Sequence, residues 1–124
     1  MAIKIDKHCR ILPAPEDGTR ILVMRYWPRG VKRDQFHSWM RDLAPSKDLL
    51  KWCKADHGGA SLEPAVYYRT WRAWYVGEML EHFQLIEQLR QRHEAGETIT
   101  LLCGCHDPAM CHRSVLGQLI LSCR

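Results

Sequence analysis

Residues 103–114, with the sequence Cys-Gly-Cys-His-Asp-Pro-Ala-Met-Cys-His-Arg-Ser, contain the side chains best suited to chemistry. Three thiols, two imidazoles, a guanidinium and a hydroxyl lie between an apolar run at residues 99–102 and an apolar helical pattern at residues 115–121. This order predicts a turn from a strand into a helix. A helix N-terminus presents unpaired N–H groups and the positive end of the helix dipole, so it attracts anions and lowers the pKa of a thiol. We expect the functional site to lie in this turn.

The leading candidates in the turn are Cys111, His112 and Arg113. Cys111 would be a thiolate nucleophile at the helix N-terminus, and His112 would transfer protons near neutral pH. Arg113, together with the Ser114 hydroxyl, would bind an anionic group of the ligand. Cys105 would serve as a resolving thiol that forms a reversible disulfide with Cys111. The alternative is structural: a small buried cysteine, a histidine cap and an arginine in a surface ion pair.

Spacing argues against two other kinds of cysteine site. A phosphatase-type loop needs a cysteine and an arginine six positions apart, whereas Arg113 lies two positions after Cys111 and eight after Cys105. The same spacing weakens a sulfurtransferase of the usual loop type. The pattern C-x-C-x5-C-H also lacks a second, widely spaced pair of zinc ligands. We therefore predict no metal and no cofactor. The alternative is a zinc site whose ligands come from Cys103, Cys105, Cys111 and His112, with His106 as a further candidate ligand.

A second group of candidates follows the apolar run at residues 20–24. Arg25 and Arg29 flank Tyr-Trp-Pro, so two guanidinium groups and the Trp27 ring would bind a phosphate or carboxylate and stack on a flat ligand. In the alternative, Trp27 packs in the core and both arginines pair with carboxylates of helices. Arg29 is the better candidate for a ligand contact, because it lies in the loop beyond the predicted strand.

The expected elements alternate between apolar strands and helices. Strands are expected at residues 3–7, 20–24 and 98–103. A first helix is expected from Asp34 to about Leu43, and a second after the N-cap Ser46. A long helix should run from Ser61 and Pro64 to about Glu94 with a kink near Gly77, and a last helix at residues 112–122. This order predicts a single α/β domain, residues 1–124, with a small, largely parallel sheet flanked by helices. In such a sheet the carboxyl ends of the strands share an edge, so residues 25–30 and 103–113 should meet there.

Composition and charge limit the class of protein. The N-terminus has no apolar signal-peptide region, and no apolar stretch reaches membrane-spanning length. Six cysteines without a secretory signal indicate reduced thiols and a cytoplasmic protein. A net charge of +4 suits a small anionic ligand and does not require nucleic acid. The sequence does not specify the oligomeric state.

Aromatic residues crowd one predicted helix. Tyr67, Trp71, Trp74 and Tyr75 have the i, i+4, i+7, i+8 spacing of a face packed on a sheet. The alternative is an exposed face that stacks on bases or binds a partner protein. We favour the core interpretation.

Two segments resemble a known family. Residues 20–31, Arg-Ile-Leu-Val-Met-Arg-Tyr-Trp-Pro-Arg-Gly-Val, resemble the signature of the YeaO-like family of uncharacterised bacterial proteins, and Trp39 and residues 42–46 and 49–52 fit it in order and spacing. The ending Cys111-His112-Arg113 is similar to the Cys-His-Arg ending of the wider superfamily. The resemblance covers most of the chain and implies a small α/β domain with a polar rim, without an established activity.

This chain departs from the family pattern at two positions. Met24 stands where family members commonly have Asp, and Cys105 stands where relatives often have Glu. An acid/base mechanism that uses those carboxylates is therefore not implied for this chain. Its residues predict instead an anion-binding site and a thiol-dependent enzyme acting on a small phosphorylated or nucleotide-like ligand. The alternatives are a nucleic-acid- or protein-binding module that uses Trp71 and Trp74, and a zinc-binding domain.

Overall fold

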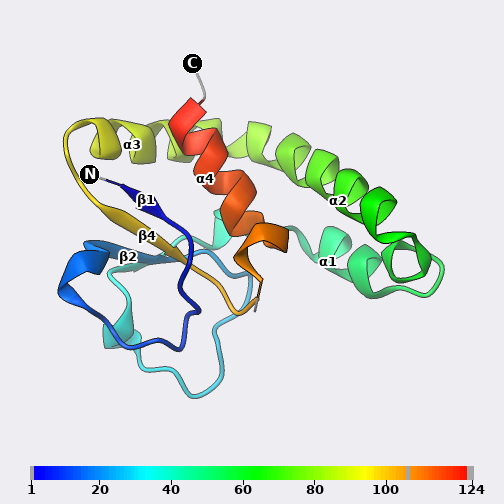
Figure 1. The fold of residues 1–124 in the computed structure, drawn as a ribbon, viewed down its shortest axis with the longest axis horizontal. Helices are drawn as coiled ribbons and strands as arrows, with labels where there is room; N and C mark the ends of the chain where they lie inside the picture. The colour runs from blue at the N-terminus through cyan, green and yellow to red at the C-terminus, as the bar shows by residue number, and fades with distance from the viewer. Residues whose placement is uncertain (1, 106, 123–124) are drawn as a thin grey trace.

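The sheet has four parallel strands in the order β1-β4-β2-β3 (Figure 1). In the computed structural model, which describes residues 2–105 and 107–122, the strands are β1 (Ile3–Lys4), β2 (Thr19–Leu22), β3 (Ser38–Trp39) and β4 (Ile99–Leu102). β2 and β4 are the central pair, with Leu22 beside Leu102. The predicted α/β fold with a small parallel sheet is confirmed.

The four α-helices lie on one side of the sheet, and the loops of the N-terminal third lie on the other (Figure 1). The helices are α1 (Lys47–Lys54), α2 (Pro64–Met79), α3 (Phe83–Glu94) and α4 (His112–Ser122). Ser46 caps α1 as predicted, because its hydroxyl accepts the Leu49 N–H at 3.1 Å. No helix in the described part of the chain is long and apolar enough to cross a bilayer.

Two helix predictions need correction. The long helix continues through Gly77 and breaks instead at a 3-10 turn, η5 (Leu80–His82). The helix expected from Asp34 to Leu43 is wrong, because that segment is split into η2 (Arg33–Gln35), β3 and η3 (Arg41–Leu43). The N–H groups of His37 and Met40 bond to carbonyls of β2, so pairing with the sheet satisfies backbone groups that a helix would otherwise pair within itself.

The two faces of the sheet have different cores. Ile21, Val23 and Leu101 belong to the large core under the helices, whereas Leu22 and Leu102 belong to a smaller one under the loops. This alternation follows from the period of two along a strand. We call the two sides of the sheet the helix face and the loop face.

A buried ionic cluster ties the loops to the start of β2. The Asp17 carboxylate is fully buried and lies 2.6 Å from Arg20 Nη1 and 2.5 Å from Lys7 Nζ. Burial alone would raise the pKa of Asp17, but hydrogen bonds from Lys7, from the Ala14 N–H and from Arg20 outweigh it and lower the pKa from 3.8 to about 2. The ionised carboxylate therefore stabilises the fold.

Asp17→Asn is expected to lower the free energy of unfolding by about 3 kcal/mol at pH 7, because it leaves Arg20 buried without its counter-ion. Since the folded pKa is depressed, the stabilisation is fully present above pH 3.8 and is lost as the pH falls through about 2. The difference between wild type and variant should therefore shrink between pH 5 and pH 2. Urea unfolding across this range measures it, with exposed Glu81→Gln as the control. A constant difference would contradict the assignment.

Candidate functional site

The candidate site lies at the carboxyl ends of β2 and β4, which are neighbouring parallel strands. Val23 and Cys103 follow directly after these strands, and the Val23 N–H bonds to the Leu102 carbonyl at 3.0 Å. The Cys9 N–H bonds to the Cys103 carbonyl, also at 3.0 Å, so the N-terminal segment joins the same edge. α4 then begins beside this edge, which brings its first residues against the end of β2.

His112 is fixed between a strand carbonyl and a thiol. Its Nε2 lies 2.5 Å from the Val23 carbonyl oxygen, and its Nδ1 lies 3.5 Å from Cys111 Sγ. A carbonyl only accepts hydrogen bonds, so in the neutral ring Nε2 carries the proton and Nδ1 presents its lone pair to Cys111. The Tyr75 ring packs edge-on against the imidazole at 5.5 Å. The ring is therefore held in the orientation in which it can accept the thiol proton.

Three thiols gather beside His112. Cys103 Sγ lies 3.8 Å from Cys105 Sγ, and the ligand atoms of Cys103, Cys111 and His112 all lie within 4.8 Å of one another. Hydrogen bonds from the Cys103 and Cys105 thiols lower the pKa of Cys111, and the His112 ring lowers it further, against the rise that burial causes. Interactions with the other two thiols raise the pKa of Cys103. The negative charge of this cluster is therefore favoured on Cys111.

Arg113 is buried behind the thiols, at 1% exposure. Its Nη1 donates to the Lys7 carbonyl and its Nη2 to the Cys105 carbonyl at 2.9 Å, and its Nε has no partner among the described residues. No carboxylate in the described part of the chain pairs with it. Arg113 thus holds the Cys105 loop against the N-terminal segment and adds positive charge beside the thiols.

The residues of the second candidate group are not gathered at the thiols. Arg25 donates from Nε to the Pro45 carbonyl at 3.1 Å and from Nη2 to the Ala44 carbonyl at 3.2 Å, so its guanidinium anchors a loop. The Trp27 ring packs in the loop-face core. Arg29 is exposed.

The N-terminus of α4 offers fewer free N–H groups than a bare helix end. A 3-10 turn, η6 (Pro108–Met110), leads into it, and the N–H groups of Met110 and Cys111 already bond to the Asp107 and Pro108 carbonyls. Ser114 is half-buried, and its N–H bonds to the Cys111 carbonyl at 3.1 Å. His106, considered as a further zinc ligand, lies outside the described residues.

The sequence did not reveal the Val23 carbonyl as a partner of the site. A backbone acceptor 89 residues away from His112 carries no side-chain signal. The only clue was the prediction that the strand ends share an edge. The aromatic helix packs in the core through part of its predicted face: Trp71 and Tyr75 are buried and Tyr67 is partly buried against the core, whereas Trp74 is 37% exposed.

The cluster also has the donor set of a metal site. Bond lengths of about 2.3 Å to sulfur and about 2.0 Å to nitrogen around tetrahedral zinc imply ligand separations of about 3.5–3.8 Å. The Cys103–Cys105 and Cys111–His112 separations of 3.8 and 3.5 Å fall in this range. Cys103, Cys111 and His112 form such a group of three donors, and Cys105 Sγ lies 3.8 Å from Cys103 Sγ at its edge.

The fold and site define a small parallel α/β domain with a thiol–imidazole pair at the carboxyl edge of its sheet. The chain belongs to the DUF488-N3 family: the model described as the active DUF488-N3 subclade matches residues 7–124. The resemblance to the YeaO-like family is thereby confirmed, since the uncharacterised protein YeaO of Escherichia coli (strain K12) is 33% identical over 108 residues, which is 86% of each chain.

Shorter matches come from mycobacteria. The uncharacterised protein Rv3073c of Mycobacterium tuberculosis (strain H37Rv) and the uncharacterised protein Mb3100c of Mycobacterium bovis are each 48% identical over 40 residues. These matches cover 31% of this chain and 34% of theirs. No solved structure matches the chain.

Arg113→Met is expected to loosen the loop that carries Cys105. The variant keeps the aliphatic bulk but loses the hydrogen bonds to the Lys7 and Cys105 carbonyls, which should cost about 3 kcal/mol of unfolding free energy. Hydrogen exchange should speed up at residues 104–111, relative to the exposed control Arg69→Met on α2. Equal exchange in the two variants would show that Arg113 does not hold the loop.

Proposed function

We propose that this protein is a thiol-dependent enzyme with Cys111 as its nucleophile and His112 as its general base. The observation that supports this most is the hydrogen bond between His112 Nε2 and the Val23 carbonyl, which leaves Nδ1 free to face Cys111 Sγ at 3.5 Å. A base held by a third group is the usual arrangement for activating a weak nucleophile. Here the third group is a backbone carbonyl in place of a carboxylate.

The proposed reaction is a displacement through a covalent intermediate. The Cys111 proton moves to His112 Nδ1, and the thiolate attacks an electrophilic centre of the substrate. The new bond to Sγ forms as the bond to the leaving group breaks, and the leaving group takes the proton from the imidazolium. Water, deprotonated by the neutral imidazole, then displaces Cys111 and restores the free enzyme.

We infer a small phosphorylated or nucleotide-like substrate. The buried cation of Arg113 lies beside the thiols, Arg29 is exposed in the loop after β2, and the net charge is +4. Cys111 is buried, whereas Cys105 is exposed, so the substrate would approach from the Cys105 side of the cluster. Arg25 and Ser114 stay secondary candidates for contact with this substrate, whereas Trp27 packs in the loop-face core.

Two further features support a thiol enzyme. The five described cysteines are free, which suits the reducing cytoplasm. Cys105 lies close enough to its neighbours to act as a resolving thiol after oxidation.

Zinc binding is the second candidate function. It is favoured by one observation, the match of the 3.8 and 3.5 Å donor separations to the edges of a tetrahedral site. In that case Cys103, Cys105, Cys111 and His112 would be four ligands of a metal, and none of the thiols would act as a nucleophile.

Labelling at pH 7 tests the nucleophile. After treatment with a chelator, iodoacetamide should modify Cys111 faster than half-buried Cys53, although Cys111 is the more buried thiol. His112→Asn should slow labelling of Cys111 about tenfold and leave Cys53 unchanged, because the base is lost. Peptide mapping by mass spectrometry measures both rates. Cys111 that stays unmodified while Cys53 reacts would rule out the nucleophile.

A second measurement addresses the substrate and the metal. Intact mass after incubation with a panel of phosphate monoesters, acyl phosphates and nucleotides should reveal an adduct that Cys111→Ser abolishes and the control Cys53→Ser keeps. Stoichiometric zinc that protects Cys103, Cys105 and Cys111 together would instead assign the cluster to the second candidate.

A further inference from the structure

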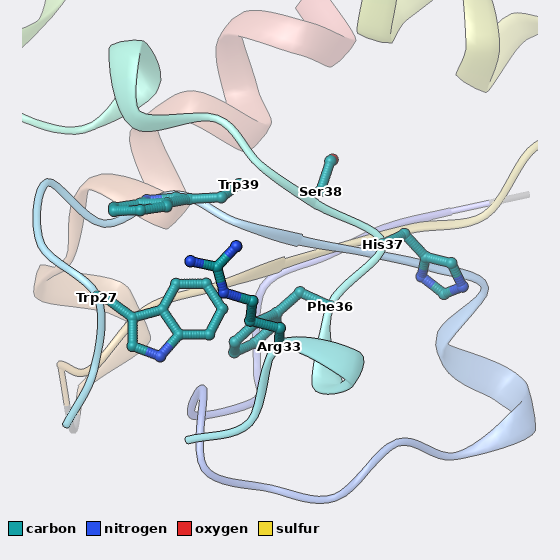
Figure 2. A pocket seen from close by; sticks show the side chains of 6 residues that line it. All are labelled: Trp27, Arg33, Phe36, His37, Ser38 and Trp39. Carbon is teal, nitrogen blue, oxygen red and sulfur yellow. The ribbon is translucent and has the colours of Figure 1, made fainter. Parts of the chain in front are cut away.

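The loop face carries a pocket of about 360 Å³ at the β3 edge of the sheet (Figure 2). Small-molecule sites usually enclose roughly 300–1,000 Å³. Figure 2 shows the Arg33 side chain extending from η2 toward the space between the two indole rings. The lining residues are Trp27, Arg33, Phe36, His37, Ser38 and Trp39.

The aromatic rings of this pocket are held in fixed orientations. The Trp27 ring lies 5.4 Å from both the Phe36 and the Trp39 rings, in edge-to-face contacts. The Trp27 Nε1–H donates to the Val31 carbonyl at 2.8 Å, and the Trp39 Nε1–H donates to the Met24 carbonyl at 2.7 Å. Because the backbone uses both indole N–H groups, the rings offer a ligand only carbon edges and π faces. A flat aromatic group suits such a surface.

The surroundings of the pocket are cationic. Arg33 is exposed and has no acidic partner among the described residues, and the Arg41 guanidinium lies 4.2 Å above the Trp39 ring. Residues 25–41 contain five arginines and lysines and one aspartate. No carboxylate is among the lining residues. These charges favour an anionic ligand and disfavour a neutral one such as a proline-rich peptide.

We propose that this pocket binds a nucleotide. The base would stack on the open faces of the aromatic rings that line the pocket, and the phosphate would pair with Arg33. Aromatic rings with flanking arginines are the combination that recognises a base joined to a phosphate. Both a free nucleotide and a single-stranded nucleic acid carry this chemistry.

The pocket is separate from the thiol cluster and does not depend on its chemistry. Its aromatic residues pack on Leu22 in the loop-face core, whereas Val23 belongs to the helix-face core together with Val115 of α4. Cys111→Ser should therefore keep the AMP-dependent shifts of the Trp27 and Trp39 indole signals, whatever happens at the thiols. A negative result for nucleotide binding in the pocket therefore leaves the proposal for Cys111 as a nucleophile standing, and the reverse is also true.

Titration of the ¹⁵N-labelled protein with AMP tests the proposal. The indole N–H signals of Trp27 and Trp39 should shift, and that of Trp74 on α2 should not. Calorimetry should show Arg33→Gln weakening AMP binding about tenfold, with Arg69→Gln as the matched control. Trp39→Leu should weaken it at least as much, with Trp74→Phe as the control. Arg33 is exposed and forms no salt bridge among the described residues, so its variant should fold normally.

Titrations with adenosine, inorganic phosphate and an oligonucleotide distinguish a free nucleotide from a single-stranded nucleic acid as the ligand. Adenosine and inorganic phosphate should each bind more weakly than AMP if the base and the phosphate both contribute. If an oligonucleotide of ten nucleotides binds more tightly than AMP and its affinity falls strongly with salt, the ligand is single-stranded nucleic acid. If it binds no more tightly than AMP, the ligand is a free nucleotide. No binding of AMP or oligonucleotide at millimolar concentration would overturn the proposal. So would an Arg33→Gln variant that binds as tightly as Arg69→Gln.

Discussion

The parallel pairing of β2 with β4 is the constraint on which both sites depend. It runs in register from Thr19 beside Ile99 to Leu22 beside Leu102, and every one of these paired residues except half-buried Thr19 is buried. Because the strands run in the same direction, Val23 and Cys103 leave the sheet at one edge. The helix that follows Cys103 then has to begin beside Val23. A shift of one residue in this register would turn the Val23 carbonyl away and leave His112 without its acceptor.

Two of the three buried arginines among the described residues, Arg20 and Arg113, are accommodated in opposite ways. Arg20 has a buried carboxylate partner in Asp17, so that end of β2 is electrically balanced. Arg113 has only carbonyl oxygens, so its charge stays uncompensated within the described protein. An uncompensated buried cation is costly unless an anion lies near it. Under the proposed function, an anionic ligand beside Arg113 would supply that anion, and its binding would stabilise the loop that Arg113 holds.

Local signals in the sequence were sufficient for elements with caps and clear periodicity. Ser46 and Pro64 marked the starts of α1 and α2, and the apolar pattern after Arg113 marked α4. The segment around Phe36 and Trp39 was different, because its apolar spacing matches a helix as well as it matches a strand edge with flanking turns. Contacts with β2 decide between the two, and such contacts are not visible in a local pattern. The same limit applies to Arg25, whose carbonyl partners lie about twenty residues away.

The end of β2 connects the two faces of the sheet. The Val23 carbonyl accepts from His112 on the helix face, and the next carbonyl, that of Met24, accepts from Trp39 on the loop face. The thiol cluster and the aromatic pocket are therefore anchored to consecutive peptide groups. A displacement of residues 23 and 24 would therefore move the hydrogen-bond acceptors of both His112 and Trp39.

The two departures from the family pattern, Met24 and Cys105, lie in segments that contact each other. A Cβ added to Gly104 would lie 3.3 Å from Met24 Cε, so this side chain reaches the loop that carries Cys105. The positions at which the resemblance places Asp and Glu are thus neighbours in space, and in this chain both hold sulfur side chains. Met24 is half-buried and Cys105 is exposed, so a carboxylate retained at position 24 alone would be the less well solvated of the two. With Met24 and Cys105 at these positions, this edge carries neither carboxylate, so the proton transfer proposed above would fall to His112, whose orientation the neighbouring Val23 carbonyl fixes.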